Sequence, residues 1–572
     1  MRLGIRFSLV ISILFFTACS GPGQRGDLSL ALEGATGVRQ EKGAPSEAYY
    51  HYILSLMRMA EGDLDGTIEE LKKALSYDPH SAHLRHSLGL LYVKKGLIPQ
   101  ALEQVEKALI ENPGHIPARL LLAGLYSSTG NKASAVTQYE AVLQIDPDNK
   151  EALLFVGSLY AEGGNLDKAL SMLRRLVEID PTSVVGNYYL GRLYAEVKNF
   201  VEAEKHFKIA LEGRPSFEAA LIDLGLTYEA QGKFNDAIET YKKLLQYFPM
   251  NHKVRDRLGQ LLVRQDKLEE AAEEFRILRR FQTENYDVRV KLGLIYFEQR
   301  KYDEAITEFN LVLLAWPNDD RVRYYLASTL EEKGDNERAL EEFRKVSEGS
   351  EFYIDSILHQ AFLLSRLKRY DEGIAVVQKG LEKEPKRAEL YNALGNLYDA
   401  TRRYEDGVTA YRKAVELDPE NERVRYSLGA ALEKLGRVEE GIKEMQEILR
   451  INPNNPFALN FIGYTWAERG ERLEEALEMI KKALEMRPND GFITDSLGWV
   501  YYQMGLIEKA VEELEKAVSL VPDDPVIVEH LGDAYLKAGK VDQAIKMYEK
   551  ALSLDPAKKG LIEKINKAKE GK

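Results

Sequence analysis

Histidines near the start of the chain are the residues best suited to hold a metal ion. His80, His83 and His86 lie close together, and His83 and His86 would share one face of a helix because of their three-residue spacing. A zinc site usually needs a third or fourth ligand and supporting groups around it. No such groups are evident in the sequence, so we expect polar surface residues here and no metal site.

Signatures of catalysis are missing from the sequence. It contains no H-E-x-x-H, no phosphate-binding G-x-x-x-x-G-K-[S/T] loop and no G-x-S-x-G turn. The single cysteine, Cys19, excludes disulfides within the chain and leaves no other thiol for nucleophilic chemistry. The 572 residues carry a net charge of −13, which argues against nucleic acid as a partner. We therefore expect no enzyme, no cofactor and no small-molecule substrate.

Residues 224–249, LGLTYEAQGKFNDAIETYKKLLQYFP, show the element from which the chain is built. Gly225 and Tyr228 lie on a first predicted helix, and Gly232 ends it. Tyr241 lies on the apolar face of a second helix, and Pro249 closes the unit because proline cannot continue a helix. A helical pair this short cannot bury both of its faces, so copies must stack on either side of it.

The pattern recurs every thirty-four residues, with one added residue near Glu471. The small residues equivalent to Gly225 are Ser55, Gly89, Ala123, Gly157, Gly191, Gly259, Gly293, Ala327, Ala361, Gly395, Gly429, Gly463, Gly498 and Gly532. This pattern, with L-G-x-x-Y, then A-x-x-x-F/Y-x-x-A, then proline, resembles the tetratricopeptide repeat over about residues 47–556. The resemblance implies an all-α fold, a right-handed α-solenoid superhelix of about fifteen helix-turn-helix repeats.

The first eighteen residues resemble a bacterial lipoprotein signal peptide. Arg2 and Arg6 precede an apolar run at residues 7–18, which is too short to span a bilayer. The run ends in Phe-Thr-Ala-Cys, similar to a lipobox, which implies lipid attachment at Cys19. Ser20, where an aspartate would favour the inner membrane, implies the outer membrane facing the periplasm. An incidental or buried cysteine is the alternative.

We expect five segments along the chain. They are a signal peptide at residues 1–18, a lipidated flexible tether at 19–45, an N-terminal arm at 46–350, a C-terminal arm at 351–556 and a capping helix at 557–572. The division after residue 350 rests on a divergent tenth repeat, where Gly373 and Gly380 would each weaken a helix by about 1 kcal/mol relative to alanine. Sequence drift within a uniform solenoid is the alternative.

Candidate binding residues follow from the family's concave groove, into which four positions of each first helix point. In the C-terminal arm these positions carry amides, acids and rings, which suit an extended peptide. They are Asn392, Asn396, Asp399, Tyr426, Phe457, Asn460, Tyr464, Phe492, Asp495, Trp499, Tyr502, Glu529 and Asp533. In the N-terminal arm they are apolar, and packing within the superhelix is the alternative for that set: Tyr52, Leu56, Met59, Leu90, Val93, Leu120, Leu154, Ile222 and Leu226.

The resemblance implies a non-catalytic scaffold lipoprotein that binds envelope proteins or peptides in its groove. Secretion, pilus, polysaccharide export and outer-membrane assembly are the processes that such a protein would serve. One alternative is an accessory subunit of an envelope enzyme, such as a glycosyltransferase or a protease. Another is a periplasmic chaperone that holds unfolded clients against the apolar N-terminal face.

Overall fold

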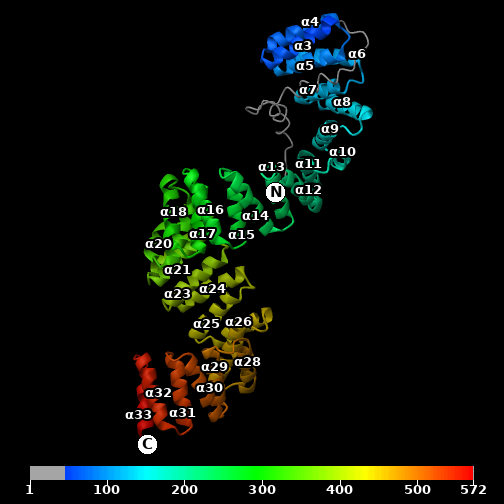
Figure 1. Cartoon of the computed structure of the whole chain (residues 1–572). Helices are drawn as coiled ribbons and strands as arrows, with labels where there is room; N and C mark the ends of the chain where they lie inside the picture. Colours follow the sequence, from blue (N-terminus) through cyan, green and yellow to red (C-terminus); the bar gives the residue numbers. More distant parts are fainter. Residues whose placement is uncertain (1–45, 571–572) are drawn as a thin grey trace. The chain divides into compact units, whose positions relative to one another are not determined.

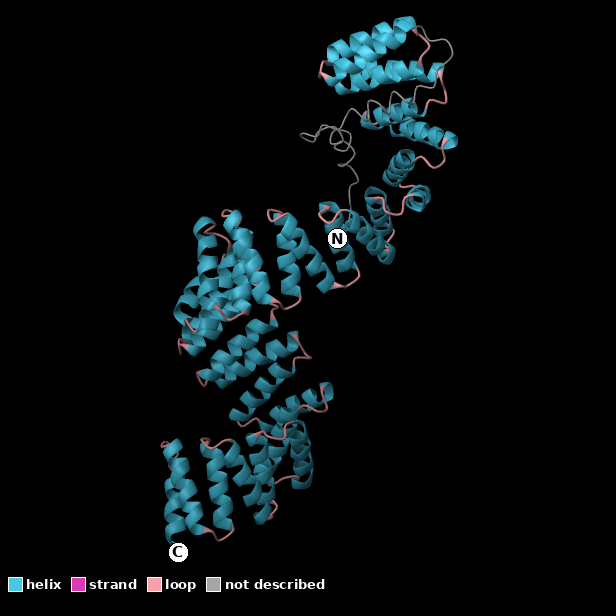
Figure 2. Cartoon of the chain, viewed as in Figure 1, coloured by secondary structure: helices cyan, strands magenta, loops and turns pink. Residues whose placement is uncertain are grey.

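The computed structural model describes residues 46–570, and every regular element in that range is an α-helix (Figures 1 and 2). Helices α3 to α32 form fifteen pairs, and α33 follows them. The expected all-α repeat fold and the number of repeats are confirmed. The expected signal peptide, Cys19 and the tether at 19–45 lie outside the described residues.

The chain divides into two compact units, Met1–Gln282 and Thr283–Lys572. The described helices of the first unit are α3 (Ser46–Ala60), α4 (Leu64–Tyr77), α5 (Ala82–Lys94), α6 (Ile98–Glu111), α7 (Ile116–Ser128), α8 (Lys132–Ile145), α9 (Lys150–Glu162), α10 (Leu166–Ile179), α11 (Val184–Glu196), α12 (Phe200–Gly213), α13 (Glu218–Ala230), α14 (Phe234–Tyr247), α15 (His252–Arg264) and α16 (Leu268–Phe281).

The helices of the second unit are α17 (Tyr286–Glu298), α18 (Tyr302–Ala315), α19 (Asp320–Lys333), α20 (Asn336–Arg344), α21 (Tyr353–Arg366), α22 (Tyr370–Lys383), α23 (Ala388–Ala400), α24 (Tyr404–Leu417), α25 (Glu422–Lys434), α26 (Val438–Ile451), α27 (Pro456–Glu468), α28 (Leu473–Met486), α29 (Gly491–Gln503), α30 (Ile507–Leu520), α31 (Pro525–Lys537), α32 (Val541–Leu554) and α33 (Gly560–Glu570).

Two repeat junctions, near Thr283 and Glu351, lack a closing proline, and only the second is irregular in the structure. The boundary between the units falls at the first of them, after Gln282. At the second, α20 ends after nine residues, whereas the other second helices have fourteen. The expected division after residue 350 lies at this second junction, and a softer joint there stays a prediction. Gly373 and Gly380 are buried, and a Cβ on either would meet a neighbouring side chain at 3.0 Å, so both allow close packing.

Each helical pair turns through one residue in the left-handed backbone region. Glycine takes this place in ten of the fifteen repeats, as at Gly232 with a φ of 74°. The other five repeats place Lys198, Asp266, Arg300, Lys368 and Arg402 there. The added residue near Glu471 is confirmed, because Arg472 is a second left-handed residue in its turn, with a φ of 48°.

The core of each repeat packs a small residue of the first helix against a large residue of the second. Gly225 lies against the ring of Tyr241, which is fully buried, and Tyr228 is buried beside them. A Cβ at Gly225 would overlap the tyrosine ring. The same contact recurs at Gly191–Phe207, Gly259–Phe275, Gly293–Phe309, Gly395–Tyr411 and Gly532–Tyr548. The paired helices therefore approach closely at these positions.

A buried arginine links several helical pairs to the proline that precedes them. Arg425 donates to the Glu444 carboxylate at 2.5 Å and to the Pro419 carbonyl at 2.8 Å. That carbonyl follows the end of a helix and needs a donor. Arg255 and Arg323 make the same two bonds in their own repeats. These arginines fix the angle at which one repeat enters the next.

Helix α33 caps the last repeat. Its buried face consists of Leu561, Ile565 and Ala568, and Ile562 is exposed. None of the helices in residues 46–570 combines the length and the apolar character that a membrane crossing requires.

Candidate functional site

The expected binding residues gather most closely around Trp499 on α29. Its indole stacks on the imidazole of His530, with ring centroids 4.1 Å apart, and on the ring of Tyr502 at 4.8 Å. The ring of Tyr464, on α27, lies 6.4 Å from that of His530, on α31. Side chains of α27 and α31, the first helices on either side of α29, therefore meet across α29, so this side of the repeats is concave. We call this surface, which the first helices α25, α27, α29 and α31 form, the α25–α31 face.

His530 connects this cluster to a buried carboxylate. Its Nδ1 lies 3.0 Å from both carboxylate oxygens of Asp495, which is 6% exposed. Sequence analysis found Asp495 and missed His530, because His530 lies next to a groove position and not at one. A search for Asp and His about one repeat apart would have found the pair, since 35 residues separate them.

Two acids at the C-terminal end of the face are neutralised by lysines of the cap. Lys564 of α33 lies 2.9 Å from Glu529 and 2.6 Å from Asp533, and Lys558 also pairs with Glu529. Burial acts to raise the pKa of Glu529, but hydrogen bonds from the two ammonium groups hold it below its ordinary value. The carboxylates of Glu529 and Asp533 are therefore already paired within the protein.

A second group of acids surrounds Tyr464. Burial raises the pKa of its phenol, and the charges of Glu468, Asp495 and Glu433 raise it further. Burial also raises the pKa of Glu433, with a further contribution from the charge of Glu468. Sequence analysis missed both glutamates, although Glu433 lies at the last groove position of α25 and the register used for Tyr426 would have found it.

Three buried polar atoms on the first helices of this region lack a hydrogen-bond partner. Within residues 46–570, the buried Nε1 of Trp499 and Oδ1 of Asn460 have no hydrogen-bond partner, and neither does Oδ1 of Asn392 on α23. Buried polar atoms without partners are costly.

Apolar rings form an exposed row beside these polar atoms. Phe457 and Phe492 start α27 and α29 and are 47% and 57% exposed, and Val526 continues the row on α31. The Tyr426 ring lies 6.3 Å from that of Phe457. A row of exposed rings across consecutive helices offers contact area to a partner.

Other expected residues have roles inside the repeats. Asn396 accepts a hydrogen bond from the buried Tyr411 hydroxyl at 2.8 Å, and Asp533 accepts one from Tyr548 at 2.7 Å. Asp399 pairs with Lys434 at 2.8 Å. Asn396 and Asp533 bind within their own helical pair and Asp399 binds the next repeat, so their side chains are less open to a partner than their sequence positions suggested.

The N-terminal residues expected to form an apolar groove are mostly half-buried, and Leu90 is the exposed one at 44%. Tyr52, Met59 and Val93 pack against the core of the first repeats. Nearby, the Tyr52 hydroxyl lies 3.0 Å from Nε2 of His83, and the rings of His86 and His115 lie 5.5 Å apart. No group of three or more His, Cys, Asp or Glu in residues 46–570 is arranged to hold a metal ion.

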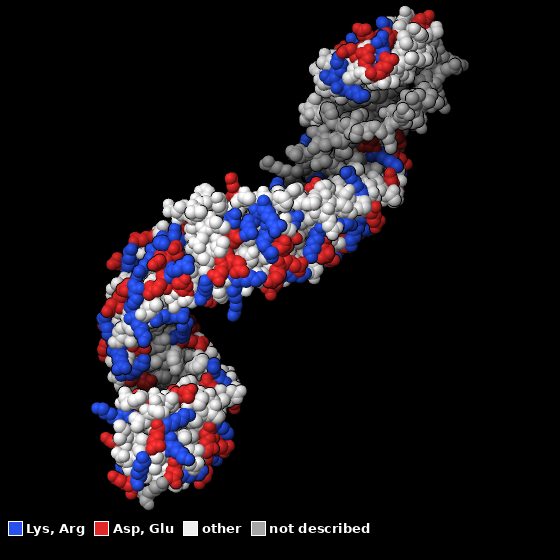
Figure 3. All heavy atoms as spheres, turned by 60° about the vertical axis from the view of Figure 1, so that its left-hand side comes forward, with Lys and Arg blue, Asp and Glu red and all other residues white. Residues whose placement is uncertain are grey.

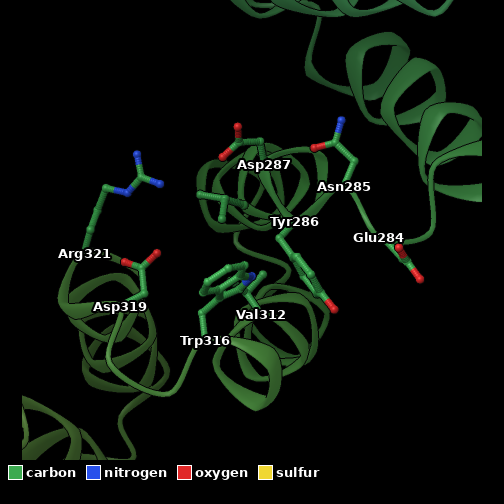
Figure 4. A pocket seen from close by; sticks show the side chains of 9 residues that line it. Glu284, Asn285, Tyr286, Asp287, Val312, Trp316, Asp319 and Arg321 are labelled. Atoms are coloured by element: carbon green, nitrogen blue, oxygen red, sulfur yellow. The ribbon is translucent and has the colours of Figure 1, made fainter.

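A cavity of about 430 Å³ opens near the start of the second unit (Figure 4). Val290, Val312 and the rings of Tyr286 and Trp316 give it an apolar side, and Trp316 is 59% exposed. Its remaining lining residues are polar or charged: Glu284, Asn285, Asp287, Asp319 and Arg321. The side chain of Asp319 caps α19, accepting a hydrogen bond from the N–H of Val322.

Charged side chains of both signs are interspersed over the visible face in Figure 3. Such a mixed surface is typical of a soluble helical repeat and does not form the basic stripe that nucleic acid requires.

Comparison with known families decides the identity of the repeat. One tetratricopeptide repeat model matches residues 222–286, 290–350, 360–422 and 392–456, and another matches 58–108, 98–152 and 133–187. Two more match 498–539 and 530–558. The chain belongs to the tetratricopeptide repeat family. Proteins with this fold are typically non-catalytic scaffolds for protein interactions, and we take protein binding as the function of this member.

Several solved structures contain similar repeats. The Cut9–Hcn1 hetero-tetramer of the APC/C matches at 15% identity, covering 85% of this chain and 95% of its own, with a TM-score of 0.37. Yeast Tom70 matches at 19% identity over 74% and 95%, with a TM-score of 0.34. A tetratricopeptide repeat protein from Parabacteroides merdae matches at 22% over 44% and 99%, with a TM-score of 0.33. No curated protein matches the chain in sequence.

Proposed function

We propose that this tetratricopeptide protein is a non-catalytic scaffold that binds an extended segment of a partner protein across its α25–α31 face. A lipid on Cys19 would hold it at the bacterial cell envelope, on the outer membrane and facing the periplasm. The observation that carries the binding half is the cluster around Trp499, where stacked rings and exposed apolar side chains occur on neighbouring first helices.

The chemistry of the face suits a polypeptide. Phe457 and Phe492 provide apolar contact for side chains of the segment. Because the Trp499 ring is held between His530 and Tyr502, little ordering is needed when the segment binds.

Photo-crosslinking in intact cells tests the binding face. A benzoyl-phenylalanine at position 492 should form a discrete crosslinked product with a partner protein. The same group in place of Met486, which is similarly exposed on the second helix α28, should not. Equal crosslinking from both positions would mean that the first-helix side has no special role.

A pair of alanine variants tests the same face without disturbing the fold. Phe457→Ala with Phe492→Ala removes exposed rings, so we expect partner capture to fall about tenfold or more while the helical content stays unchanged. Met486→Ala with Leu520→Ala removes similarly exposed side chains from second helices and serves as the matched control.

The anchor is supported by the sequence alone, since the only cysteine ends the apolar run at residues 7–18. Intact-mass analysis of the mature protein from membranes should show a lipidated N-terminus at Cys19. Cys19→Ser should abolish the lipid and release the protein from the membrane. An unmodified Cys19 in the mature protein would disprove the anchor and leave the binding face untouched.

A further inference from the structure

We propose that the cavity at the start of the second unit is a second protein-binding site, which takes a large apolar side chain of a partner segment and a lysine or arginine next to it in that segment. The lining residues, from Glu284 to Arg321, share no helix with the α25–α31 face. The inference goes beyond the proposed function and does not depend on it.

The cavity lies where the start of α17 meets the turn between α18 and α19 (Figure 4). Val290 and Val312 are buried and belong to the core of this repeat. Tyr286 begins α17 and Trp316 is the C-cap residue of α18, and their ring centroids lie 6.3 Å apart with the planes at 85°. The two rings therefore continue the apolar core outward to the surface.

The backbone of Trp316 is fixed on both sides of the residue. Its N–H donates to the Val312 carbonyl at 2.8 Å, and its carbonyl accepts a hydrogen bond from the Asp319 N–H at 3.1 Å. A turn of defined geometry thus presents the indole, although most of the residue is exposed. A ring that is already placed needs little ordering when a partner binds.

The fold does not require an indole at this position. Trp316 directly precedes the closing proline Pro317, and ten of the twelve other repeats with a closing proline have a polar or charged residue there. Since the repeat folds with a polar residue at this place, the exposed ring has another role. Aspartate occupies the position in five repeats, as Asp78, Asp146, Asp180, Asp418 and Asp555.

The apolar surface extends beyond the cavity, which favours a polypeptide partner. Leu311 and Leu314, in the last turns of α18, are 40% and 80% exposed. A small molecule held between the rings would leave Leu314 uncovered, whereas a protein segment anchored in the cavity can also cover the end of α18. Large apolar side chains that enter pockets are the usual anchors of protein interfaces.

The charges around the cavity favour a basic residue beside that anchor. Three carboxylates and one guanidinium line it, a net charge of −2, from Glu284, Asp287, Asp319 and Arg321. An ammonium or guanidinium at an indole gains from the ring face as well as from nearby carboxylates. The chain makes such a contact itself at Trp466, where the guanidinium of Arg472 lies 3.9 Å from the ring centre.

Selection from a display library of randomised twelve-residue peptides tests the site. The full-length protein with Phe457→Ala and Phe492→Ala is the target, so the exposed rings of the α25–α31 face cannot contribute. It should select peptides with a large apolar residue next to lysine or arginine. Adding Trp316→Asp should weaken these peptides tenfold or more and keep the fold, because five other repeats have aspartate there. Adding Ile110→Asp, at an exposed position on α6, should not weaken them.

A charge variant tests the basic residue separately. Glu284→Gln with Asp287→Asn keeps side-chain shape and removes two of the three carboxylates. In the same target it should abolish the preference for lysine and arginine and reduce the salt dependence of binding, while the apolar preference stays. Glu474→Gln with Glu485→Gln removes the same charge from exposed positions on α28 and should change neither property.

Three results would overturn the inference. If the target selects no peptides, or if Trp316→Asp binds the selected peptides as tightly as the target does, the cavity is not a binding site for a protein segment. If the charge variant keeps the preference for basic peptides, the class of partner is wrong. If sedimentation shows a dimer of the wild-type protein that Trp316→Asp dissociates, the occupant is a second copy of the chain. Failure of the α25–α31 face would leave all three readouts unaffected.

Discussion

The indole of Trp499 lies 4.1 Å from the imidazole of His530, with the ring planes 19° apart, although the two residues belong to different repeats. Asp495 holds the other side of the imidazole through Nδ1. The stack therefore ties α29 to α31 and fixes the tryptophan before any partner arrives. A binding face that is already ordered loses less entropy on association.

His530→Ala should destabilise the last repeats. The change removes the ring stack and leaves the buried carboxylate of Asp495 without its donor, so we expect a loss of about 2 kcal/mol. Hydrogen exchange of α29 and α31 should show faster opening by the corresponding amount. His80→Ala, at an exposed position in the first unit, is the control. Unchanged exchange in α29 would mean that the stack is incidental.

Gly225→Ala should weaken the sixth repeat. An added Cβ would overlap the ring of Tyr241, which is fully buried and cannot move without disturbing its neighbours. Overpacking of this kind costs about 1–3 kcal/mol, measured as a lower urea midpoint. Gly349→Ala should be neutral, because no atom lies within 4 Å of its added Cβ. Adding Tyr241→Leu to the Gly225 variant should restore part of the loss if the overlap is the cause.

The repeat architecture was predictable from the sequence because the residues that determine the fold of each repeat lie within that repeat. Gly225 permits close approach, Gly232 turns the chain and Pro249 ends the second helix, and all three act within one repeat. The contacts of the binding face were not predictable in this way. The approach of Tyr464 to His530 depends on small rotations that accumulate over two repeats, and no single repeat encodes them.

The ion pairs made by Lys564 of the capping helix α33 were also not predictable from the sequence. The pairing of Lys564 with Glu529 and Asp533 depends on how α33 docks on α32, and the apolar pattern fixes that docking only approximately. The apolar residues of α33 do not all face the repeat, because Ile562 is exposed while the smaller Ala568 is buried. A shift of one residue in this face redirects every charged side chain of the helix.

Arg300→Gly should stabilise the protein. Arg300 has a φ of 58° in a turn where ten other repeats place glycine, and a side chain in this region costs about 1 kcal/mol. Glycine removes the strain but makes the unfolded chain more flexible, so we expect a net gain of about 0.5 kcal/mol. Gly334→Ala, at the equivalent place one repeat later, should lose stability. Thermal unfolding of the two variants should shift in opposite directions.

The ion pair between Arg425 and Glu444 should contribute more to the free energy of unfolding than a surface ion pair does. Both side chains are largely buried, and the arginine also bonds the carbonyl of Pro419. Arg425→Ala leaves that carbonyl and the carboxylate without their donor, so we expect a loss of about 2–3 kcal/mol. Glu444→Gln should cost less, and the double variant should cost less than the sum of the two. Additive losses in urea unfolding would show that the pair is not coupled.

His86 should make the first repeats sensitive to acid. Burial, followed by the nearby charges of His115 and His83, lowers the pKa of His86 from 6.5 to about 4. Between pH 6.5 and pH 4, His86 binds a proton in the unfolded chain but stays neutral in the folded repeat. The contribution of His86 to the free energy of unfolding is therefore fully present above pH 6.5 and is lost as the pH falls towards 4. Between pH 7 and pH 5 we expect a loss of about 1–2 kcal/mol from α5 and α7. Hydrogen exchange of these helices, corrected for intrinsic rates, measures it. His86→Gln cannot take up the proton, so its loss over the same interval should be smaller by that amount. An equal loss in both proteins would assign the acid sensitivity to other groups.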